Sequence, residues 1–194
     1  MKNSYAWHGI LLAAGKGTRF DASGSRNKLL QALPSGATVA LSSAQTLLSV
    51  LPASLAVVSP LNDVLVSLLN TAGCKTTICH NAHNGMASSL VHALKHSPDD
   101  CSGWIIALAD MPYVQADTIS ALVHALEDGA GIVAPTYMGR RGNPVGFSRD
   151  YLPQLLALKG DKGARDLLKQ LRVTEIEVDD VGILQDIDVP KDLQ

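Results

Sequence analysis

Short apolar runs alternate with segments of helical periodicity along the chain, and this alternation restricts the fold more than any other feature. The run WIIALAD, residues 104–110, is apolar until its last residue, as expected for a strand that is covered on both faces. In residues 116–128, apolar side chains recur at i, i+3, i+4 and i+7, which is one helical stripe. Strands that alternate with helices form right-handed βαβ units around a mostly parallel sheet. We therefore predict one Rossmann-like α/β domain of three layers over residues 1–194, with helices on both faces of the sheet.

The predicted strands are Gly9–Ala13, Leu55–Ser59, Lys75–Cys79, Trp104–Ala109, Gly131–Pro135 and Val173–Val178, with a short extra strand within RGNPVGFSR at 141–149. The predicted helices are Thr38–Leu51, Leu61–Ala72, Gly85–Lys95, 116–128 (with Asp117 or Thr118 as its cap) and Lys162–Leu171. In a sheet of this kind, ligands bind outside the carboxyl ends of the strands. The loop after the first strand and Asp110 after the fourth are therefore expected to face one crevice.

The composition places the chain among globular proteins and argues against nucleic-acid partners. Of its 194 residues, 46% are apolar and 18% are charged. A net charge of −2 argues against binding to duplex nucleic acid, which requires a basic face. An aromatic content of 4% argues against a protein that stacks single-stranded bases on its rings.

The segment Leu29–Asn62 carries no charged residue, which raises the question of a membrane span. Prolines and polar residues interrupt it before the roughly 20 apolar residues that a span requires, so we predict a buried helix and a buried strand. The apolar run Ile10–Ala14 is too short for a signal peptide. The three cysteines form no C-x-x-C pair and are expected to be reduced thiols. We expect a cytoplasmic protein with no membrane partner.

The loop after the first predicted strand, GKGTRFDASGSRNK at residues 15–28, is open and cationic. Gly15 and Gly17 let the backbone approach a ligand closely, and its N–H groups can form a concave anion site. Arg19 and Lys28 can pair with phosphate oxygens. The sequence lacks the Walker, dinucleotide-binding and kinase signatures. From these residues alone, a phosphate-binding loop and a surface turn with solvated cations are equally compatible with the sequence.

Asp110 ends an apolar strand with a hard oxygen ligand of the kind that Mg²⁺ prefers. Pro112 biases Met111 toward extended backbone, so that no helix begins directly after the aspartate. A solvated aspartate that caps a loop accounts for this residue equally well.

Six stretches occur in order along the chain: LAAGKGTRF…NKLL (12–30), NGMASSL (84–90), LADMPYV (108–114), GRRGNPVGF (139–147), GDKGARDLL (160–168) and DIDVPKDL (186–193). Together they resemble the nucleotidyltransferases that make molybdenum cofactor dinucleotides, and most closely the cytidylyltransferase branch. The resemblance implies an enzyme that joins a nucleoside triphosphate to an anionic acceptor and releases pyrophosphate. It covers nearly the whole chain.

The resemblance implies roles for the residues of the glycine-rich loop. The backbone that would receive the base and phosphates is formed by Ala13, Ala14, Gly15 and Gly17. Arg19 and Lys28 would neutralise the α-phosphate and the departing pyrophosphate. Lys28 matches the signature lysine of the family and is the stronger candidate for stabilising the transition state.

The resemblance also implies a metal site and an acceptor site. Asp110 would bind Mg²⁺, with Mn²⁺ as the alternative metal. Asp188 would be the second metal ligand, and Asp186 is the other candidate for that position. The residues that would contact the nucleotide or acceptor are Asn81, Gly85 and Ser88 or Ser89, although a normally capped helix accounts for them equally well. The cations expected to face the acceptor phosphate, with ordinary surface charge as the alternative, are Arg140, Arg141, Lys162 and Arg165.

The sequence departs from the family pattern at three places. The spacer between Arg19 and Lys28 is longer than usual, Asn143 stands where histidine is frequent, and Ala109 replaces a common glycine. These departures bear on the shape of the loop tip and on the identity of the acceptor. They bear less on the phosphate chemistry than on the acceptor.

Ala14 bears on the choice of base, because the cytidylyl branch reads Leu-Ala-Ala-Gly where the guanylyl branch reads Leu-Ala-Gly-Gly. We predict transfer of CMP from CTP to the phosphate of a molybdopterin-type cofactor. A molybdoenzyme or chaperone is the expected transient partner. The alternatives are guanylyl transfer to the same acceptor, transfer to a sugar or polyol phosphate, and a noncatalytic carrier of the cofactor.

The histidine pairs His80/His83 and His92/His96 have the spacing of helical metal ligands. The residues between His92 and His96 lack the glutamate of a zinc peptidase helix. Surface or structural roles are favoured for all four.

Overall fold

The computed structural model describes residues 7–160 and 163–193. The strands in these ranges are β1 (Trp7–Ala13), β2 (Ser54–Val58), β3 (Lys75–Ile78), β4 (Gly103–Leu108), β5 (Ile132–Tyr137), β6 (Arg140–Arg141), β7 (Val145–Ser148) and β8 (Thr174–Glu177). They form one sheet in the order β3-β2-β1-β4-β7-β5-β6, with β8 paired to β5. The pairs among β1, β2, β3 and β4 are parallel, as is β5 with β8, whereas β7 runs antiparallel to β4 and β5. The predicted single α/β domain with a mostly parallel sheet is confirmed.

Each of the six main predicted strands is present, and its observed ends differ from the prediction by at most two residues. The short strand predicted within 141–149 is β7. The predicted helices correspond to α1 (Val39–Val50), α2 (Asp63–Thr71), α3 (Met86–His96), α4 (Ala116–Glu127) and α6 (Arg165–Gln170). The predicted start of the last one, Lys162, lies outside the described residues. The short elements β6 and α5 (Leu152–Leu156) have no predicted counterpart.

The predicted cap of α4 is wrong. Gln115 is the N-cap residue, without a side-chain capping bond, and Asp117 and Thr118 lie inside the first turn. The Thr118 hydroxyl instead donates a hydrogen bond to Asp180 Oδ2 at 2.7 Å. The Thr118 side chain, predicted to cap the helix, thus bonds to the distant carboxylate of Asp180.

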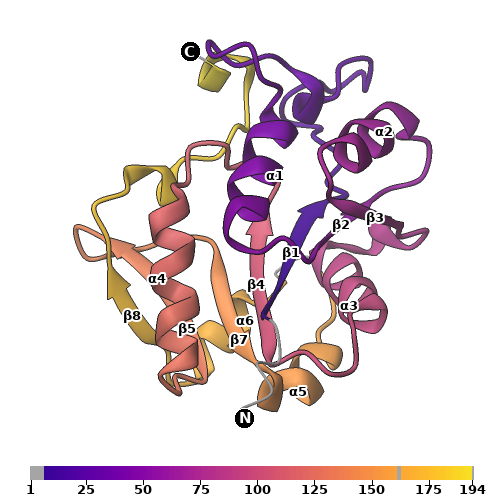
Figure 1. Cartoon of the computed structure of the whole chain (residues 1–194). Helices are drawn as coiled ribbons and strands as arrows, with labels where there is room; N and C mark the ends of the chain where they lie inside the picture. Colours follow the sequence, from indigo (N-terminus) through magenta and orange to yellow (C-terminus); the bar gives the residue numbers. More distant parts are fainter. Residues whose placement is uncertain (1–6, 161–162, 194) are drawn as a thin grey trace.

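Two apolar cores lie on opposite faces of the sheet. Helices α1, α2 and α4 pack on one face, and α3, α5 and α6 pack on the other (Figure 1). Ile10 and Leu11 are adjacent in β1, and both are fully buried, in different cores, because successive side chains of a strand point to opposite faces. The cysteines are buried free thiols, and burial raises the pKa of Cys74 to about 11.

The loops that follow β1 and β4 meet the C-terminal segment at one edge of the sheet. In Figure 1 the yellow C-terminal end lies beside the indigo-to-purple loop that follows β1. The Ile187 N–H donates to the Asp110 carbonyl at 2.8 Å, which ties this segment to the end of β4. The uncharged stretch Leu29–Asn62 contains α1 and β2, as predicted. None of the described helices has both the length and the apolar character needed to cross a membrane.

Candidate functional site

The loop that follows β1 begins with a left-handed turn and is anchored in the core. Gly17 has a φ of 62°, a conformation that a side chain disfavours. Phe20 is only 5% exposed and belongs to the apolar core against which α1 packs. The guanidinium of Arg26 lies over the Phe20 ring, 5.4 Å from its centroid, and donates to Gln31 Oε1 at 3.1 Å. These contacts hold both arms of the loop against the body of the domain.

The long spacer of this loop is folded around one carboxylate. Asp21 accepts hydrogen bonds from the backbone N–H groups of Ser23 and Arg26, at 2.9 and 2.7 Å. It also accepts from the hydroxyls of Ser23 and Ser25, at 2.6 and 2.9 Å. These bonds, with that of the Ser23 hydroxyl the largest contributor, hold the pKa of Asp21 well below its usual value. The additional residues therefore form an ordered tip.

Lys28 is a mostly buried cation with three oxygen neighbours. The residue begins a 3₁₀ turn and is 8% exposed. Its Nζ donates to Asp110 Oδ2 at 2.6 Å and to the Ile187 carbonyl at 2.9 Å, and lies 3.6 Å from Asp188 Oδ1. Burying a charge is costly unless it has partners of this kind. Lys28 therefore links the loop after β1, the end of β4 and the C-terminal segment.

Two carboxylates, Asp110 and Asp188, contact this lysine, and Asp186 is near both of them. Asp188 contacts Lys28 and also pairs with the exposed guanidinium of Arg19. Burial, followed by repulsion from Asp188 and Asp110, raises the pKa of Asp186. The structure thus brings together four predicted residues, Arg19, Lys28, Asp110 and Asp188. The competing candidate Asp186 lies close enough to respond to the charges of both other acids.

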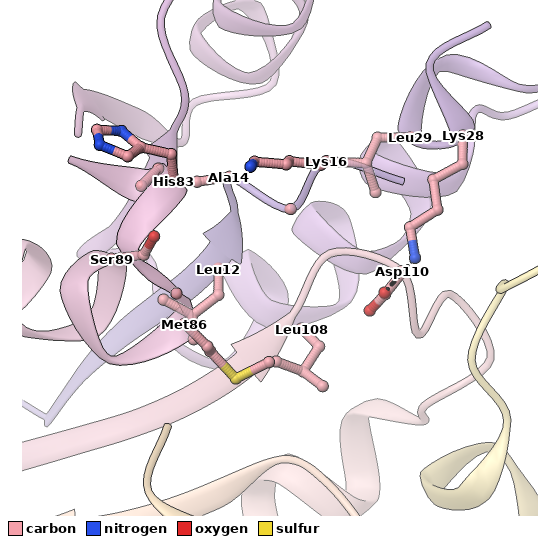
Figure 2. Close-up of a pocket in the computed structure, with 13 residues that line it drawn as sticks. Leu12, Ala14, Lys16, Lys28, Leu29, His83, Met86, Ser89, Leu108 and Asp110 are labelled. Atoms are coloured by element: carbon pink, nitrogen blue, oxygen red, sulfur yellow. Dashed lines mark hydrogen bonds and ion pairs between the residues drawn. The ribbon is translucent and has the colours of Figure 1, made fainter. Parts of the chain in front are cut away.

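A cavity of about 310 Å³ opens beside Lys28 and Asp110. Figure 2 shows these two side chains pointing toward each other on one side of it, with His83, Met86 and Ser89 on the other. The predicted residues that line it are Ala14, Gly15, Lys28, Gly85, Ser89 and Asp110. Lining residues for which the sequence analysis assigned no ligand role include Lys16, His83 and Met86.

Other predicted residues do not line this cavity. Asn81 and Ser88 line a separate hollow beside His80 and His92. Ser88 and Ser89 are successive in α3, where neighbours diverge by about 100°, so only Ser89 reaches the cavity. Ala13 is 2% exposed and packs in the core. Successive side chains point to opposite faces of the sheet, so Ala13 points away from the side to which Ala14 points.

Gly17 contributes to the site indirectly. A Cβ at this position would stand 3.5 Å from Lys28 Cγ and 3.7 Å from Cδ. The glycine therefore places no side chain against the lysine stem, at a backbone conformation that other residues rarely adopt.

The sequence as a whole matches a known family. Residues 9–176 match the model of the MobA-like NTP transferase domain. The chain belongs to this family. The glycine-rich loop, Lys28 and Asp110, which the fold brings together, lie inside the matched residues, whereas Asp186 and Asp188 lie beyond them.

The chain is also similar to individual proteins and solved structures. The chain is 31% identical over 119 residues to the purine catabolism protein PucB of Bacillus subtilis (strain 168), an alignment of 59% of this chain with 57% of PucB. The match thus spans little more than half the length of that curated relative. The crystal structure of Rv0371c from Mycobacterium tuberculosis H37Rv is similar, with a TM-score of 0.85 at 23% identity over 98% of this chain and 96% of that one. A complex of Rv0371c with manganese has a TM-score of 0.80 at 22% identity, over 96% and 95% of the two chains. At these identities the two structures show a common fold.

A second, cationic cavity of about 560 Å³ adjoins the first in this MobA-like domain. The two share the side chains of Leu12, Met86 and Leu108. The cations that line the second cavity are Arg19, Arg141, Arg165 and Lys169. Two of the four cations predicted to face an acceptor are thus among its lining residues; Arg140 is not, and Lys162 lies outside the described residues.

The donors beside Lys28 fit a hard divalent cation that is shared with a ligand. Asp110 and Asp188 offer carboxylate oxygens around one position, which suits Mg²⁺ or Mn²⁺. Within residues 7–160 and 163–193, no group of three or more His, Cys, Asp or Glu side chains could hold a metal ion. The protein therefore offers two carboxylates, and further oxygens have to come from water or phosphate.

Asp180 anchors the C-terminal segment that carries these acids. It is 2% exposed and accepts hydrogen bonds from the N–H groups of Gln115 and Gly182, both at 2.9 Å, besides that from Thr118. We expect Asp180→Ala to destabilise the fold by about 2–4 kcal/mol, because it leaves buried donors unpaired. The melting temperature should fall by roughly 5–15 °C for a domain of this size. Differential scanning calorimetry measures the change.

The matched control for this prediction is Thr118→Val, which removes one of the three donors and keeps the volume. It should lower the melting temperature by less than Asp180→Ala does. An Asp180→Ala protein that melts with the wild type would show that the segment is held by other contacts.

Proposed function

We propose that the chain is a nucleotidyltransferase that transfers CMP from CTP to the phosphate monoester of a molybdopterin-type cofactor, with Mg²⁺ or Mn²⁺ as its metal. The observation that carries the proposal is the 2.6 Å contact between Lys28 and Asp110 on the wall of the cavity that Gly15 also lines. This arrangement combines a fixed cation and a hard oxygen ligand with a loop suited to phosphate. The family assignment supports the transfer of a nucleotidyl group.

The reaction requires no strong general base. An oxygen of the acceptor phosphate attacks the α-phosphorus of CTP and forms a new phosphoanhydride bond, while the bond from that phosphorus to the β-phosphate oxygen breaks and pyrophosphate leaves. The attacking oxygen is already ionised, so positioning and charge neutralisation can supply the rate. Lys28 and Arg19 would neutralise charge on the phosphates. Asp110 and Asp188 would hold the metal ion, which would supply further charge neutralisation, and the manganese complex of Rv0371c supports such a role.

The second cavity supports an anionic acceptor. Arg141, Arg165 and Lys169 line it, and Arg19, which also lines it, pairs with Asp188. The two cavities share lining residues, so an acceptor phosphate in the second can approach a nucleotide in the first. Arg141 is itself oriented by Glu175 and by the Leu168 carbonyl, to which it donates at 3.0 Å.

The choice of CTP depends on Ala14. This residue is 7% exposed and lines the first cavity. The guanylyl branch has glycine at this position and leaves free the space that the methyl group of Ala14 occupies. The methyl group therefore favours cytosine, which is smaller than guanine. One methyl group discriminates by about 1–3 kcal/mol, which is roughly 10–200-fold.

A competition assay tests the proposed substrates. The purified chain is incubated with Mg²⁺, equal concentrations of CTP and GTP, and purified molybdopterin-type cofactor, and both dinucleotide products are quantified. We expect the cytidine product to exceed the guanosine product by at least about tenfold. Pyrophosphate should appear only when the acceptor is present.

Each alternative has its own outcome in this assay. A clear preference for GTP would replace the cytidylyl assignment by a guanylyl one. Turnover with sugar or polyol phosphates, and none with the cofactor, would replace the acceptor. Binding of the cofactor without any release of pyrophosphate would indicate a noncatalytic carrier.

A further inference from the structure

The ammonium of Lys28 lies against both carboxylates that the proposed function assigns to the metal. Nζ is 2.6 Å from Asp110 Oδ2 and 3.6 Å from Asp188 Oδ1. The lysine therefore already neutralises part of the charge of both acids. A second cation on the same two side chains would meet this ammonium at short range, and like charges repel strongly in a site that is largely shielded from water.

The protein also offers few ligands of its own to a free metal ion. Two carboxylates bind Mg²⁺ or Mn²⁺ well only when other oxygens complete the coordination sphere, and nucleotide phosphates commonly do so. Conversely, a metal-free triphosphate in the cavity meets the carboxylate of Asp110 on its wall, with that of Asp188 3.6 Å from Lys28 Nζ. The triphosphate supplies the oxygen ligands that the metal needs, and the metal supplies the positive charge that the triphosphate needs beside these acids.

The lysine has room to exchange partners. Its side chain lines the cavity of about 310 Å³, and its stem passes beside Gly17, which has no side chain to cover it. A change of rotamer can therefore move Nζ away from the carboxylates and toward phosphate oxygens in the cavity. Its third partner, the Ile187 carbonyl, is neutral and is not a competitor for charge.

We propose that Lys28 and the divalent metal compete for Asp110 and Asp188, so that the metal enters only together with the triphosphate, which provides Lys28 with new oxygen partners. This exchange rests on the proposed function and adds an order of binding to it. In the free protein the lysine acts as an internal substitute for the metal. By linkage, the nucleotide strengthens metal binding by the same factor as the metal strengthens nucleotide binding.

Titration with Mn²⁺ in the absence of nucleotide tests the competition directly. The signal of free Mn²⁺ in electron paramagnetic resonance gives the affinity of the wild type, of Lys28→Gln and of Arg26→Gln. We expect Lys28→Gln to bind Mn²⁺ at least about tenfold more tightly than the wild type, which is about 1.4 kcal/mol. Arg26→Gln removes the same charge from the same loop, away from the acids, and should bind within about twofold of the wild type.

Two further measurements keep the test decisive. Asp110→Asn in the Lys28→Gln background should abolish the gained affinity. With the α,β-methylene analogue of CTP, the wild type should gain at least about tenfold in Mn²⁺ affinity, and Lys28→Gln should gain less. The wild-type measurement stands even if the glutamine variant fails to fold, and melting curves show whether it does.

Equal Mn²⁺ affinities of wild type and Lys28→Gln without nucleotide would overturn the exchange. So would a wild type that binds Mn²⁺ equally well with and without the analogue. If either result is found while CTP turnover is normal, the exchange fails and the proposed function stands. If the expected affinities are found without CTP turnover, the exchange stands and the proposed function fails.

Discussion

Lys28→Ala is expected to lower kcat for CTP by about 10²–10³, the usual effect of removing one preorganised donor from a transition state. The lysine contributes a mostly buried cation that contacts Asp110 and the Ile187 carbonyl, and truncation leaves the α-phosphate and the departing pyrophosphate without it. Because the charge on the departing group grows in the transition state, kcat should fall more than KM rises. Steady-state release of pyrophosphate measures both constants.

The control for this experiment is Arg26→Ala in the same loop. The Arg26 side chain contacts Phe20 and Gln31, and among the described residues it forms no ion pair with Asp110 or Asp188. The kcat should therefore stay within about threefold of the wild type, as expected for a screened surface charge. Circular dichroism of both variants excludes unfolding as the cause of any loss. Turnover by Lys28→Ala at the wild-type rate would remove the lysine from the mechanism.

Asp110→Asn is expected to abolish metal-dependent turnover. An amide carries no charge and is a poor ligand for Mg²⁺, and a catalytic metal stabilises a transition state by several kcal/mol, so the loss should exceed about a thousandfold. Raising the Mg²⁺ concentration should recover little activity. The variant should also leave Lys28 with Asp188 as its remaining ionic partner.

The matched variant is Asp117→Asn, an exposed aspartate in the first turn of α4 that caps nothing. It should turn over like the wild type in the same Mg²⁺ titration. An Asp110→Asn protein with normal Mg²⁺-dependent rates would contradict the assignment of this carboxylate, whatever the behaviour of the control.

The fold was largely predictable, because buried parallel strands and amphipathic helices have distinct periods. The run that forms β4 is apolar at nearly every residue, and the stripe in α4 recurs with helical spacing. The insertion of β7 between β4 and β5 was not predictable, since the antiparallel pairing depends on neighbours far away in the sequence. The cap of α4 was missed for the same reason: Asp180, more than sixty residues away, takes the Thr118 hydroxyl.

The candidate site was predictable only in part. Topology brings the ends of β1 and β4 to one edge, so the proximity of Lys28 and Asp110 follows from the order of the strands. Asn81 and Ser88 line a separate hollow, and of the two serines that the sequence offered as alternatives, the rotation of α3 turns Ser89 toward the cavity. Four hydrogen bonds to Asp21 order the long loop, and no sequence motif predicts them.

The decisive measurement is a crystal structure with Mg²⁺ and the α,β-methylene analogue of CTP. We expect the triphosphate to lie between the Gly15–Gly17 backbone and Lys28, with the metal joining it to Asp110, and with the cytosine beside Ala14. A nucleotide bound elsewhere on the domain, or a triphosphate in the cavity whose metal is held without Asp110, would contradict it.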